Sequence, residues 1–444
     1  MLAKLNFIKE KRGFIKYLKN TSWLIAEKIL RITVGFIVGI WVTRYLGPER
    51  FGLFSYAQSF VGLFLPIATL GLDGIIVRDI VNANNKMEEI ISTAFLLKLA
   101  GAIIAFLLII IAINFTLNDR YTNILIFIIS GSIILQAFNV IDMYFQAHVL
   151  SKYMVLANVI SLFISSIIKI FLIFIKAPLI FFVWTVIFDN FILCLGFIFF
   201  FFKYSDFRIN NFKFNNNIAI GLLADSWPLI LSNASIAIYM RMDQVMIQNM
   251  LGSQAVGQYA AAVRLGEAWY FIPAVICSSF FPAIINAKKK DQEIYHERLQ
   301  KLYDVMTWMA IGLAIFITIF AIDIVNILYG PKFDKAAEIL VIHIWTGVFV
   351  SIGMIFSRFL MAENLTRKLF IRAFIGAILN VILNFILIPK YGIRGAAIAT
   401  LVSHIIVNYI YDIFDKAMYG QLYMKTKSFL VLRIFKVLNN EKIY

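Results

Sequence analysis

Uninterrupted apolar runs constrain this chain more than any other feature of its sequence. The run from Ala102 to Ile113 contains no polar side chain, and similar stretches recur along the 444 residues. Hydrophobic residues make up 61% of the chain and charged residues only 15%, against about 25% charged in a soluble domain. Such segments have no polar face to present to water. The sequence therefore excludes an ordinary soluble protein and predicts an all-α integral membrane protein.

Twelve apolar windows are long enough to cross a bilayer as helices. They lie near residues 21–43, 51–72, 90–113, 122–143, 154–175, 179–202, 218–240, 258–284, 303–328, 336–361, 371–388 and 395–419. Lys and Arg concentrate in the tails and loops on the side of the N-terminus, and basic loops favour the cytoplasm. We therefore expect both termini to be cytoplasmic. The longest predicted outer loop runs only from about 241 to 257, too short for a folded domain.

An internal repeat predicts two lobes of six spans each. The segment 46–52 (LGPERFG) recurs in part as 251–257 (LGSQAVG). Because six is an even number, both halves start on the same side and are expected to be related by an axis along the membrane normal. A chance match of common Leu-Gly turns is the alternative. The predicted organisation is a cytoplasmic tail at 1–20, an N-lobe at 21–202, a cytoplasmic linker at 203–217, a C-lobe at 218–419 and a cytoplasmic tail at 420–444.

Charge and cysteine usage exclude several other classes of function. The net charge is +16, but the basic residues lie mostly in loops between spans and not on one solvated face, so nucleic acid is not the expected partner. Cys194 and Cys277 lie in apolar runs without partners at motif spacing, so neither a disulfide nor a metal site is predicted. His343 and His404 also lack ligand-spaced partners, and interhelical hydrogen bonding is their expected role. The basic N-terminal segment is expected to be a retained tail and not a signal peptide.

Basic residues within spans are the main candidates for substrate contacts, since a charge inside the bilayer is costly. Arg31 falls near the middle of the first span and must face protein or water. Glu27 lies four residues earlier on the same helical face, so an internal ion pair is the alternative role. Arg264 and Glu267 repeat this arrangement at a spacing of three in the eighth span. Lys28 points elsewhere, either into a cavity or toward the interface by snorkelling.

Ionisable residues elsewhere in the spans are candidates for ion coupling or for structural pairs. Asp189, Asp225 and Asp323 are the acidic candidates. A buried carboxylate can carry a proton or bind sodium, and pairing with a Lys or hydrogen bonding to a Ser or Asn is an equal alternative. Lys98 and Lys169 lie near span ends, where snorkelling is the expected behaviour.

Prolines within spans two, seven and eight predict helix bends beside a cavity. Pro66, Pro228 and Pro273 each remove a helical hydrogen bond, which is tolerated where the freed carbonyl meets protein or water. We therefore expect a cavity lined by spans one, two, seven and eight. Asn380 and Asn384, one helical turn apart, are expected to hydrogen-bond neighbouring helices.

Three segments resemble a known transporter family. Residues 43–56 (TRYLGPERFGLFSY), 70–72 (LGL) and 389–400 (PKYGIRGAAIAT) are similar to the polysaccharide biosynthesis branch, the Wzx-type flippases, of the multidrug/oligosaccharidyl-lipid/polysaccharide exporter superfamily. The resemblance covers nearly the whole chain. It implies a MATE-like, V-shaped bundle of two six-helix lobes that opens alternately to either side. Basic cavity residues of the family are thought to meet a pyrophosphate, and Arg31 and Arg264 are the positions here that match.

The resemblance also implies a cargo and partners. The cargo would be an undecaprenyl-pyrophosphate-linked repeat unit of O antigen (lipopolysaccharide) or a related surface polysaccharide, moved outward across a bacterial inner membrane. A polysaccharide polymerase and a chain-length regulator would be protein partners, and no cofactor is expected. Outward movement of negative charge is downhill by about 2.3 kcal/mol per charge per 100 mV. We therefore expect the membrane potential to contribute, with proton or sodium coupling a further hypothesis.

Three alternative functions stay open. A multidrug or cation exporter of the same fold would favour a cavity dominated by acids and aromatics, whereas this chain places arginines in its spans. A lipid II flippase is chemically close but usually has two further spans. A membrane-embedded polysaccharide polymerase or ligase generally needs a long outer loop, which the predicted topology lacks. We therefore do not expect the protein to be an enzyme.

Overall fold

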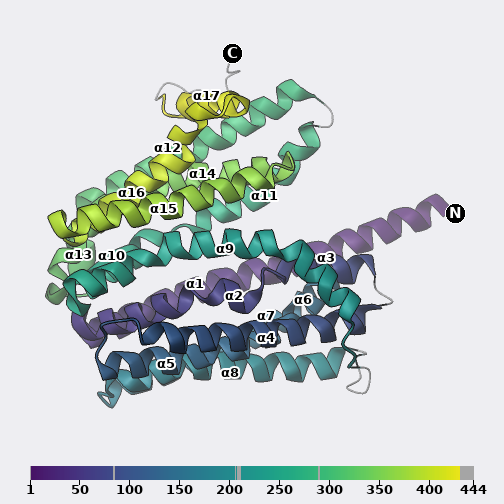
Figure 1. Cartoon of the computed structure of the whole chain (residues 1–444). Helices are drawn as coiled ribbons and strands as arrows, with labels where there is room; N and C mark the ends of the chain where they lie inside the picture. The colour runs from purple at the N-terminus through teal and green to yellow at the C-terminus, as the bar shows by residue number, and fades with distance from the viewer. Residues whose placement is uncertain (1, 84–85, 206, 208–211, 289–290, 431–444) are drawn as a thin grey trace. The chain divides into compact units, whose positions relative to one another are not determined.

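The computed structural model is all-helical, and it describes residues 2–83, 86–205, 207, 212–288 and 291–430 (Figure 1). Among those residues, nine helices are long and apolar enough to cross a membrane, and the count rises to eleven if each of two bent helix pairs is one span. This confirms the predicted all-α membrane architecture.

The count of up to eleven differs from the predicted twelve at the start of the chain, where two predicted windows are counted together. The windows 21–43 and 51–72 both fall in one bent pair, Asn20–Gly62 with Leu65–Asn82, whose two parts meet at 43°. In the first part of this pair, α1 (Leu2–Gly62) consists of two helices joined across a kink at Gly47, which lies in the turn predicted between the two windows. The second bent pair, Pro331–His343 with Thr346–Ala362, contains the predicted window 336–361.

The described residues form two compact units. Unit 1 comprises those within 1–46 and 57–237, and unit 2 those within 47–56 and 238–444. This division follows packing, whereas the predicted lobes 21–202 and 218–419 follow span order, and those lobe boundaries stay a prediction. Residues 206 and 208–211 of the predicted linker and 431–444 of the predicted C-terminal tail lie outside the described residues.

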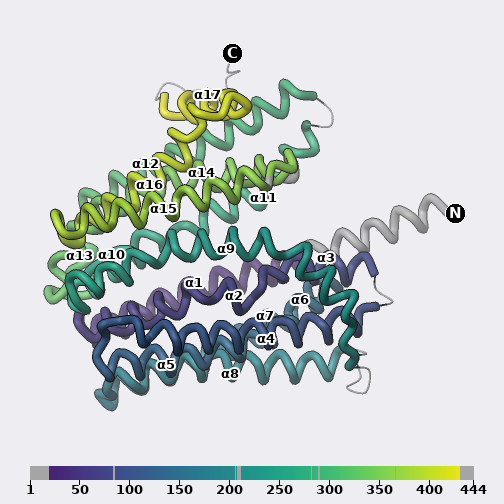
Figure 2. Tube along the Cα trace, viewed as in Figure 1, coloured from purple at the N-terminus to yellow at the C-terminus, as the bar shows by residue number. Residues whose placement is uncertain are grey.

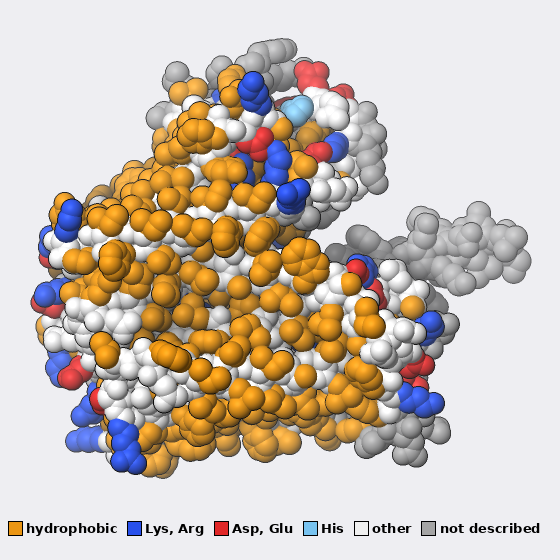
Figure 3. All heavy atoms as spheres, in the orientation of Figure 1, with side chains coloured by type: hydrophobic (Ala, Val, Ile, Leu, Met, Phe, Trp, Pro, Cys, Tyr) orange, Lys and Arg blue, Asp and Glu red, His pale blue; other side chains and the backbone are white. Residues whose placement is uncertain are grey.

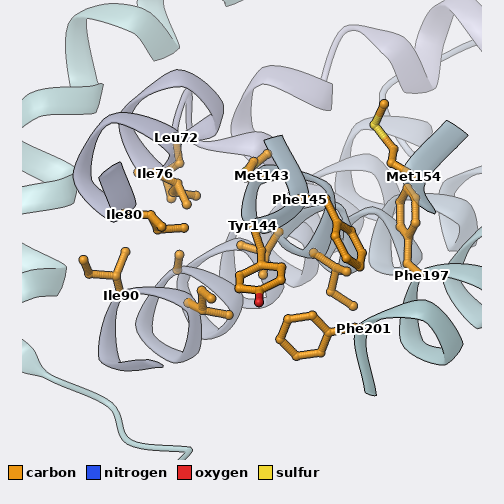
Figure 4. Close-up of a cluster of buried hydrophobic side chains, with 14 of the residues drawn as sticks. Leu72, Ile76, Ile80, Ile90, Met143, Tyr144, Phe145, Met154, Phe197 and Phe201 are labelled. Atoms are coloured by element: carbon orange, nitrogen blue, oxygen red, sulfur yellow. The ribbon is translucent and has the colours of Figure 1, made fainter. Parts of the chain in front are cut away.

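Unit 1 is built around one apolar core. Besides the first part of α1, its helices are α2 (Leu65–Thr69), α3 (Asp73–Asn82), α4 (Met87–Ile113), α5 (Arg120–Leu135), η2 (Gln136–Asn139), α6 (Val140–Ala147), α7 (Ser151–Phe174), α8 (Leu179–Tyr204) and the start of α9 (Asn216–Leu251). Leu72, Ile76, Tyr144, Phe145 and Phe201 share the core, with α3, α6 and α8 contributing facing side chains (Figure 4). Their burial fixes the short helices α3 and α6 against the long spans.

Besides residues 47–56, unit 2 holds the described residues from 238 within α9 onward, which are coloured from teal to yellow in Figure 2. Its further helices are α10 (Ser253–Glu267), α11 (Phe271–Lys288), α12 (Gln292–Leu328), η4 (Pro331–Phe333), α13 (Asp334–His343), α14 (Thr346–Ala362), α15 (Thr366–Tyr391), α16 (Ile393–Asn408), η5 (Ile410–Phe414), η6 (Lys416–Met418) and α17 (Tyr419–Ser428). Tyr303 and Met306 of α12 pack with Ile352 and Ile355 of α14 in its core.

On the face shown in Figure 3, hydrophobic side chains cover much of the surface, while charged side chains gather toward its edges. Ile319 and Ile322 of α12 are each 67% exposed, whereas Ser92, Ser130 and Asn380 are fully buried. A bilayer makes this arrangement favourable, because lipid tails solvate the apolar faces and polar groups find partners only inside the protein.

The predicted outer loop at 241–257 is wrong. Helix α9 continues to Leu251, and α10 begins at Ser253 after the single turn residue Gly252. Polar residues such as Arg241 and Asp243 made this stretch resemble a loop in hydropathy. Asp243 is 4% exposed, so its polarity is accommodated within the helical bundle instead of in water.

The two repeat glycines occupy equivalent backbone positions. Gly47 has φ 70° and ψ 173°, and Gly252 has φ 84° and ψ 177°, a region that strongly favours glycine. Five residues later, a Cβ at Gly52 would overlap the carbonyl of Ser253, and a Cβ at Gly257 would overlap that of Pro48. The sequence repeat therefore corresponds to a reciprocal contact of two backbones within unit 2.

We predict that Gly52→Ala or Gly257→Ala destabilises the protein by about 1–3 kcal/mol, the usual cost of forcing atoms into a packed contact. Thermal unfolding in detergent measures this loss. Gly312→Ala is the matched control, because a Cβ at that helical glycine meets nothing within 4 Å. Equal stability of Gly52→Ala and Gly312→Ala would show that the backbones do not touch.

The short helix α17 is attached to the rest of unit 2 through a buried lysine. Lys425 of α17 is fully buried, and its Nζ donates to Asp412 Oδ2 at 2.7 Å. Arg372 donates to the other oxygen of the same carboxylate. Phe356 lies 3.6 Å from Lys425 Nζ, measured to its ring centroid. Burial outweighs the attraction of Asp412 and lowers the pKa of Lys425 from 10.5 to about 8.

This lowered pKa predicts that the protein becomes more stable as the pH rises from about 8 to 10.5. In that window the unfolded chain holds a proton on Lys425 that the folded chain has released, so alkali favours folding. The shift corresponds to about 3 kcal/mol. Urea unfolding of the wild type and of Lys425→Met across this window tests it. The pH-dependent gain is expected to vanish in the variant, where Arg372 still pairs Asp412, and an unchanged gain would assign it to another group.

Candidate functional site

The structure places Arg31 in an ion pair with Glu27 on α1. The Glu27 side chain is 8% exposed and the Arg31 side chain 53% exposed. Lys28 is exposed on the same helix. The internal ion pair, which was the alternative role for Arg31, is therefore formed. Even so, about half of the Arg31 side chain stays accessible. A carboxylate that occupies one edge of a guanidinium leaves other N–H donors for a second anion.

A second charged pair lies close to this one in unit 1. Lys98 of α4 donates to Asp73 Oδ1 of α3 at 2.6 Å, and its side chain is 2% exposed. Asp142 of α6 lies within electrostatic range of Arg31, Asp73 and Lys98. The expectation that Lys98 snorkels to the interface is wrong, because its anion comes from another helix 25 residues earlier in the chain.

The three acids predicted for ion coupling have different surroundings. Asp225 of α9 accepts from Arg78 of α3 at 2.5 Å, and both side chains are about half exposed. Asp189 of α8 accepts from Lys169 of α7 at 2.7 Å. Asp323 is exposed on α12. The first two are thus held in ion pairs, an alternative that was open from the sequence.

In unit 2, Arg264 and Glu267 lie one turn apart on α10 and are partly buried. Tyr329 lies within electrostatic range of Arg264, and Arg241 and Asp243 lie within range of Glu267. The neighbouring His343 is 2% exposed, and its Nδ1 has no hydrogen-bond partner among the described residues. The expected interhelical hydrogen bond is therefore not seen at this nitrogen.

The most elaborate polar site of unit 2 surrounds Asp243 of α9. Its Oδ2 accepts from Tyr259 of α10 at 2.5 Å and from Thr400 of α16 at 2.6 Å, and its Oδ1 accepts from Asn384 of α15 at 2.6 Å. Asn384 also donates to Asn380 at 3.0 Å. The prediction that these asparagines bond neighbouring helices is confirmed for Asn384. Four helices thus meet at one buried carboxylate.

The Asp243 site contains more oxygen atoms than its hydrogen bonds use. Asn384 Oδ1, and Tyr239 Oη within electrostatic range of Asp243, are buried without a hydrogen-bond partner in the described structure. The asparagine amides can be turned to exchange their oxygen and nitrogen positions. A carboxylate with hydroxyl and amide oxygens suits a hard cation such as sodium, and a carboxylate out of water also suits a proton. The described residues contain no group of three or more His, Cys, Asp or Glu that would suit a transition metal.

Sequence reasoning missed Asp243 because it was assigned to the loop at 241–257. The available signal was the pair of asparagines at 380 and 384, since two amides on one face of a span need polar partners. The carboxylate they bind lies 141 residues earlier than Asn384. A single sequence contains no information about such a pairing.

The three predicted bend prolines occupy different helical positions. Pro66 lies in the first turn of α2, just after the break between Gly62 and Leu65. Pro273 lies in the first turn of α11. A proline there loses no helical hydrogen bond. Pro228 lies inside α9, which continues through it.

Solved transporters share this fold. The inward-facing conformation of a MATE family multidrug resistance transporter of the MOP superfamily aligns with a TM-score of 0.69, at 16% identity, over 93% of this chain and 96% of that one. The lipid II flippase MurJ, in an inward closed conformation, aligns with a TM-score of 0.64, at 18% identity, over 94% of each chain. These likenesses confirm the predicted MATE-like fold.

Two curated relatives are similar in sequence. The capsular polysaccharide biosynthesis protein CapF of Staphylococcus aureus is 23% identical over 415 residues, which span 90% of this chain and 100% of CapF. The probable low-salt glycan biosynthesis flippase Agl15 of Haloferax volcanii is 26% identical over 166 residues, 37% of this chain and 35% of Agl15.

Family profiles cover most of the chain. The MatE profile matches residues 228–386. The profile described as polysaccharide biosynthesis protein matches residues 17–288, which is more than half of the 444 residues. The chain therefore belongs to the polysaccharide biosynthesis protein family.

Proposed function

We propose that this protein is a flippase that moves polyprenyl-diphosphate-linked oligosaccharides outward across the cytoplasmic membrane by alternating access. The observation that carries the proposal is that a member of the polysaccharide biosynthesis family keeps Arg31, Lys98 and Arg264 within its spans. The names of CapF, Agl15 and MurJ, two of them flippases, support a lipid-linked glycan as the cargo class. Undecaprenyl pyrophosphate is the proposed carrier, and the glycan a repeat unit of a surface polysaccharide such as O antigen or capsule.

The chemistry of this cargo explains why cations are retained in the spans. A diphosphate and several sugars cannot cross about 30 Å of hydrocarbon, because their charges and hydroxyls would lose water without replacement. Arg31, Lys28 and Arg264 supply donors that replace this water. Glu27 binds Arg31 when no cargo is present, so that the positive charge of Arg31 is not left unpaired. The diphosphate then binds the exposed part of the Arg31 guanidinium. Within unit 2, Glu267 is the proposed charge partner of Arg264 on α10.

Two energy sources are proposed for outward movement. The cargo carries about two negative charges, so an inside-negative potential of 100 mV supplies about 5 kcal/mol. The second source is a proton or sodium ion that binds Asp243. Among the earlier candidates, Asp189 and Asp225 would first have to leave their lysine and arginine partners. Asp243 accepts only neutral donors among its hydrogen bonds, and it is therefore preferred.

We place both termini in the cytoplasm, as the distribution of basic residues suggests. A polysaccharide polymerase and a chain-length regulator are the proposed protein partners, since a moved repeat unit must be joined to others. The proposed role is transport without covalent chemistry. Export of drugs is the second candidate, and the MatE match at 228–386 favours it.

We predict that Arg31→Ala and Arg264→Ala each lower glycan transport by about tenfold or more. A charge-assisted hydrogen bond contributes about 1.5–3 kcal/mol, and 1.4 kcal/mol is a factor of ten. Surface polysaccharide in a strain that depends on this gene, and flux of a lipid-linked oligosaccharide into proteoliposomes, measure the loss. Unimpaired transport in the double variant would remove both arginines as phosphate contacts.

Arg120→Ala is the matched control, because Arg120 is an exposed arginine at the start of α5. It should leave transport unchanged. Arg31→Lys should restore only part of the flux, since an ammonium cannot bind a phosphate through two parallel bonds. Efflux of cationic drugs that survives the double Ala substitution, without any glycan flux in the wild type, would favour the multidrug exporter instead.

We predict that Asp243→Asn abolishes the response of transport to an ion gradient and preserves its response to membrane potential. The amide keeps the shape of the side chain but loses the charge that binds a cation. Proteoliposomes with an imposed potential, a sodium gradient or a pH gradient separate the three driving forces. The gradient to which the wild type responds identifies the ion.

Glu293→Gln removes an equal charge from an exposed site in the first turn of α12 and serves as the control. It should respond to all gradients as the wild type does. An Asp243→Asn protein that keeps its full response to the gradients would rule out this carboxylate as the coupling site. Gel filtration of both variants checks that the helical bundle is intact.

A further inference from the structure

Helix α17 buries its polar face and exposes its apolar face, the reverse of a helix on the surface of a soluble protein. Gln421, Lys425 and Ser428 lie on one face at spacings of four and three, and all three are buried. The opposite face and the preceding η5 expose apolar and aromatic side chains. We call this surface the α17 aromatic face; its members are Ile413, Phe414, Tyr419, Tyr423 and Leu430.

The buried face is bonded to unit 2 by specific polar contacts. Tyr303 of α12 donates to Gln421 at 2.9 Å, and Thr307 of the same helix lies 3.1 Å from the Ser428 hydroxyl. Lys425 donates to the backbone carbonyl of Asn408 at 2.8 Å, in addition to Asp412. These partners fix the rotation of α17 about its axis. The outward direction of the α17 aromatic face is therefore set by the fold and does not depend on what covers it.

The α17 aromatic face is too apolar for water. Phe414 is 80% and Tyr423 62% exposed, and exposed large apolar side chains gathered on one helix face are typical of a contact with lipid or protein. The face is continuous with a membrane span, because Phe414 ends the candidate span Ile393–Phe414.

Its length and its charges point to the headgroup region. Ten residues of helix extend about 15 Å, half of a hydrocarbon core of about 30 Å, so α17 cannot span it. Lys416 is exposed beside the face, and Lys427 Nζ lies 5.2 Å from the ring centroid of Tyr423. Tyrosines and flanking lysines are characteristic of helices at membrane interfaces.

We propose that the α17 aromatic face lies at the lipid headgroup level of the bilayer that the spans cross, with Lys416 and Lys427 bound to anionic headgroups. The partner is thus the lipid surface itself. Helix α17 then fixes the depth of the adjoining ends of α12 and α16 in the membrane. This inference requires only that the chain is an integral membrane protein, and it is independent of the proposed cargo.

Spin labels measure the depth of α17 in the full-length protein. Cys194 and Cys277, both buried, are replaced by Ala, and a label is placed at Tyr423→Cys or, one turn earlier, at Tyr419→Cys. The protein is reconstituted in phosphatidylcholine vesicles containing phosphatidylglycerol. Collision with oxygen reports exposure to lipid, and collision with a nickel chelate reports exposure to water. Glu293→Cys, exposed in the first turn of α12, is the aqueous reference, and Ile319→Cys, on the exposed apolar face of α12, is the hydrocarbon reference.

Labels at 423 and 419 are expected to prefer oxygen over the nickel chelate more strongly than the label at 293 and less strongly than the label at 319. Nickel accessibility equal to that at 293, at both positions, would overturn the proposal and leave the face for water or for a partner protein. Two label sites guard against one label displacing the helix.

The lysines are tested by changing the lipid. In pure phosphatidylcholine the label at 423 is expected to become more accessible to the nickel chelate than in vesicles containing phosphatidylglycerol. Lys416→Gln with Lys427→Gln should abolish this difference. Identical accessibility of the wild-type label in the two lipids would overturn the role of anionic headgroups. Lys332→Gln, at an exposed lysine of η4, is the control and should keep the difference.

Discussion

Lipid offers no hydrogen-bond partners, so the polar groups of this protein must find partners within the protein itself. This requirement governs the structure. Backbone groups satisfy it through helices, and side chains satisfy it by turning inward, as Asn380 and Lys98 do. Apolar side chains then face the lipid, so the molecule has its polarity reversed relative to a soluble protein. The buried charges follow from the same requirement: Lys98 is paired with Asp73, and Asp243 accepts hydrogen bonds from three donors.

The sequence was sufficient to predict the fold class, because the length of an apolar segment alone identifies a membrane span. It was weaker on the length of turns: Gly47 and Gly252 each interrupt the helices at a single residue, inside the longer gaps that hydropathy leaves at 44–50 and 241–257. Hydropathy also failed wherever a polar residue was satisfied inside the bundle. Asp243 was taken for part of a loop on polarity alone, although three donors from three other helices surround it.

Candidate site residues were recognisable from the sequence because a charge within a membrane span is energetically costly. Their partners were not recognisable in this way. Arg31 and Glu27 are four residues apart, so their pair was foreseeable from helical spacing. The partners Lys98 and Asp73 belong to different helices, as do Asp225 and Arg78, which are 147 residues apart. Only tertiary structure brings such residues together. A hypothesis about one buried charge therefore stays open until the helices that face it are known.

Helix α9 combines the two kinds of charged site in one element. Asp225 near its start is bonded to Arg78 in unit 1, and Asp243 near its end is bonded to Tyr259 in unit 2. A helix bonded at both ends follows a relative movement of its two anchors only if it bends between them or releases one. Pro228, which lies between them and lacks a backbone donor, lowers the cost of bending. A change in the partners of Asp243 alters one of these two anchors directly. An ion bound at Asp243, as proposed above, would therefore act on the same helix that carries Asp225.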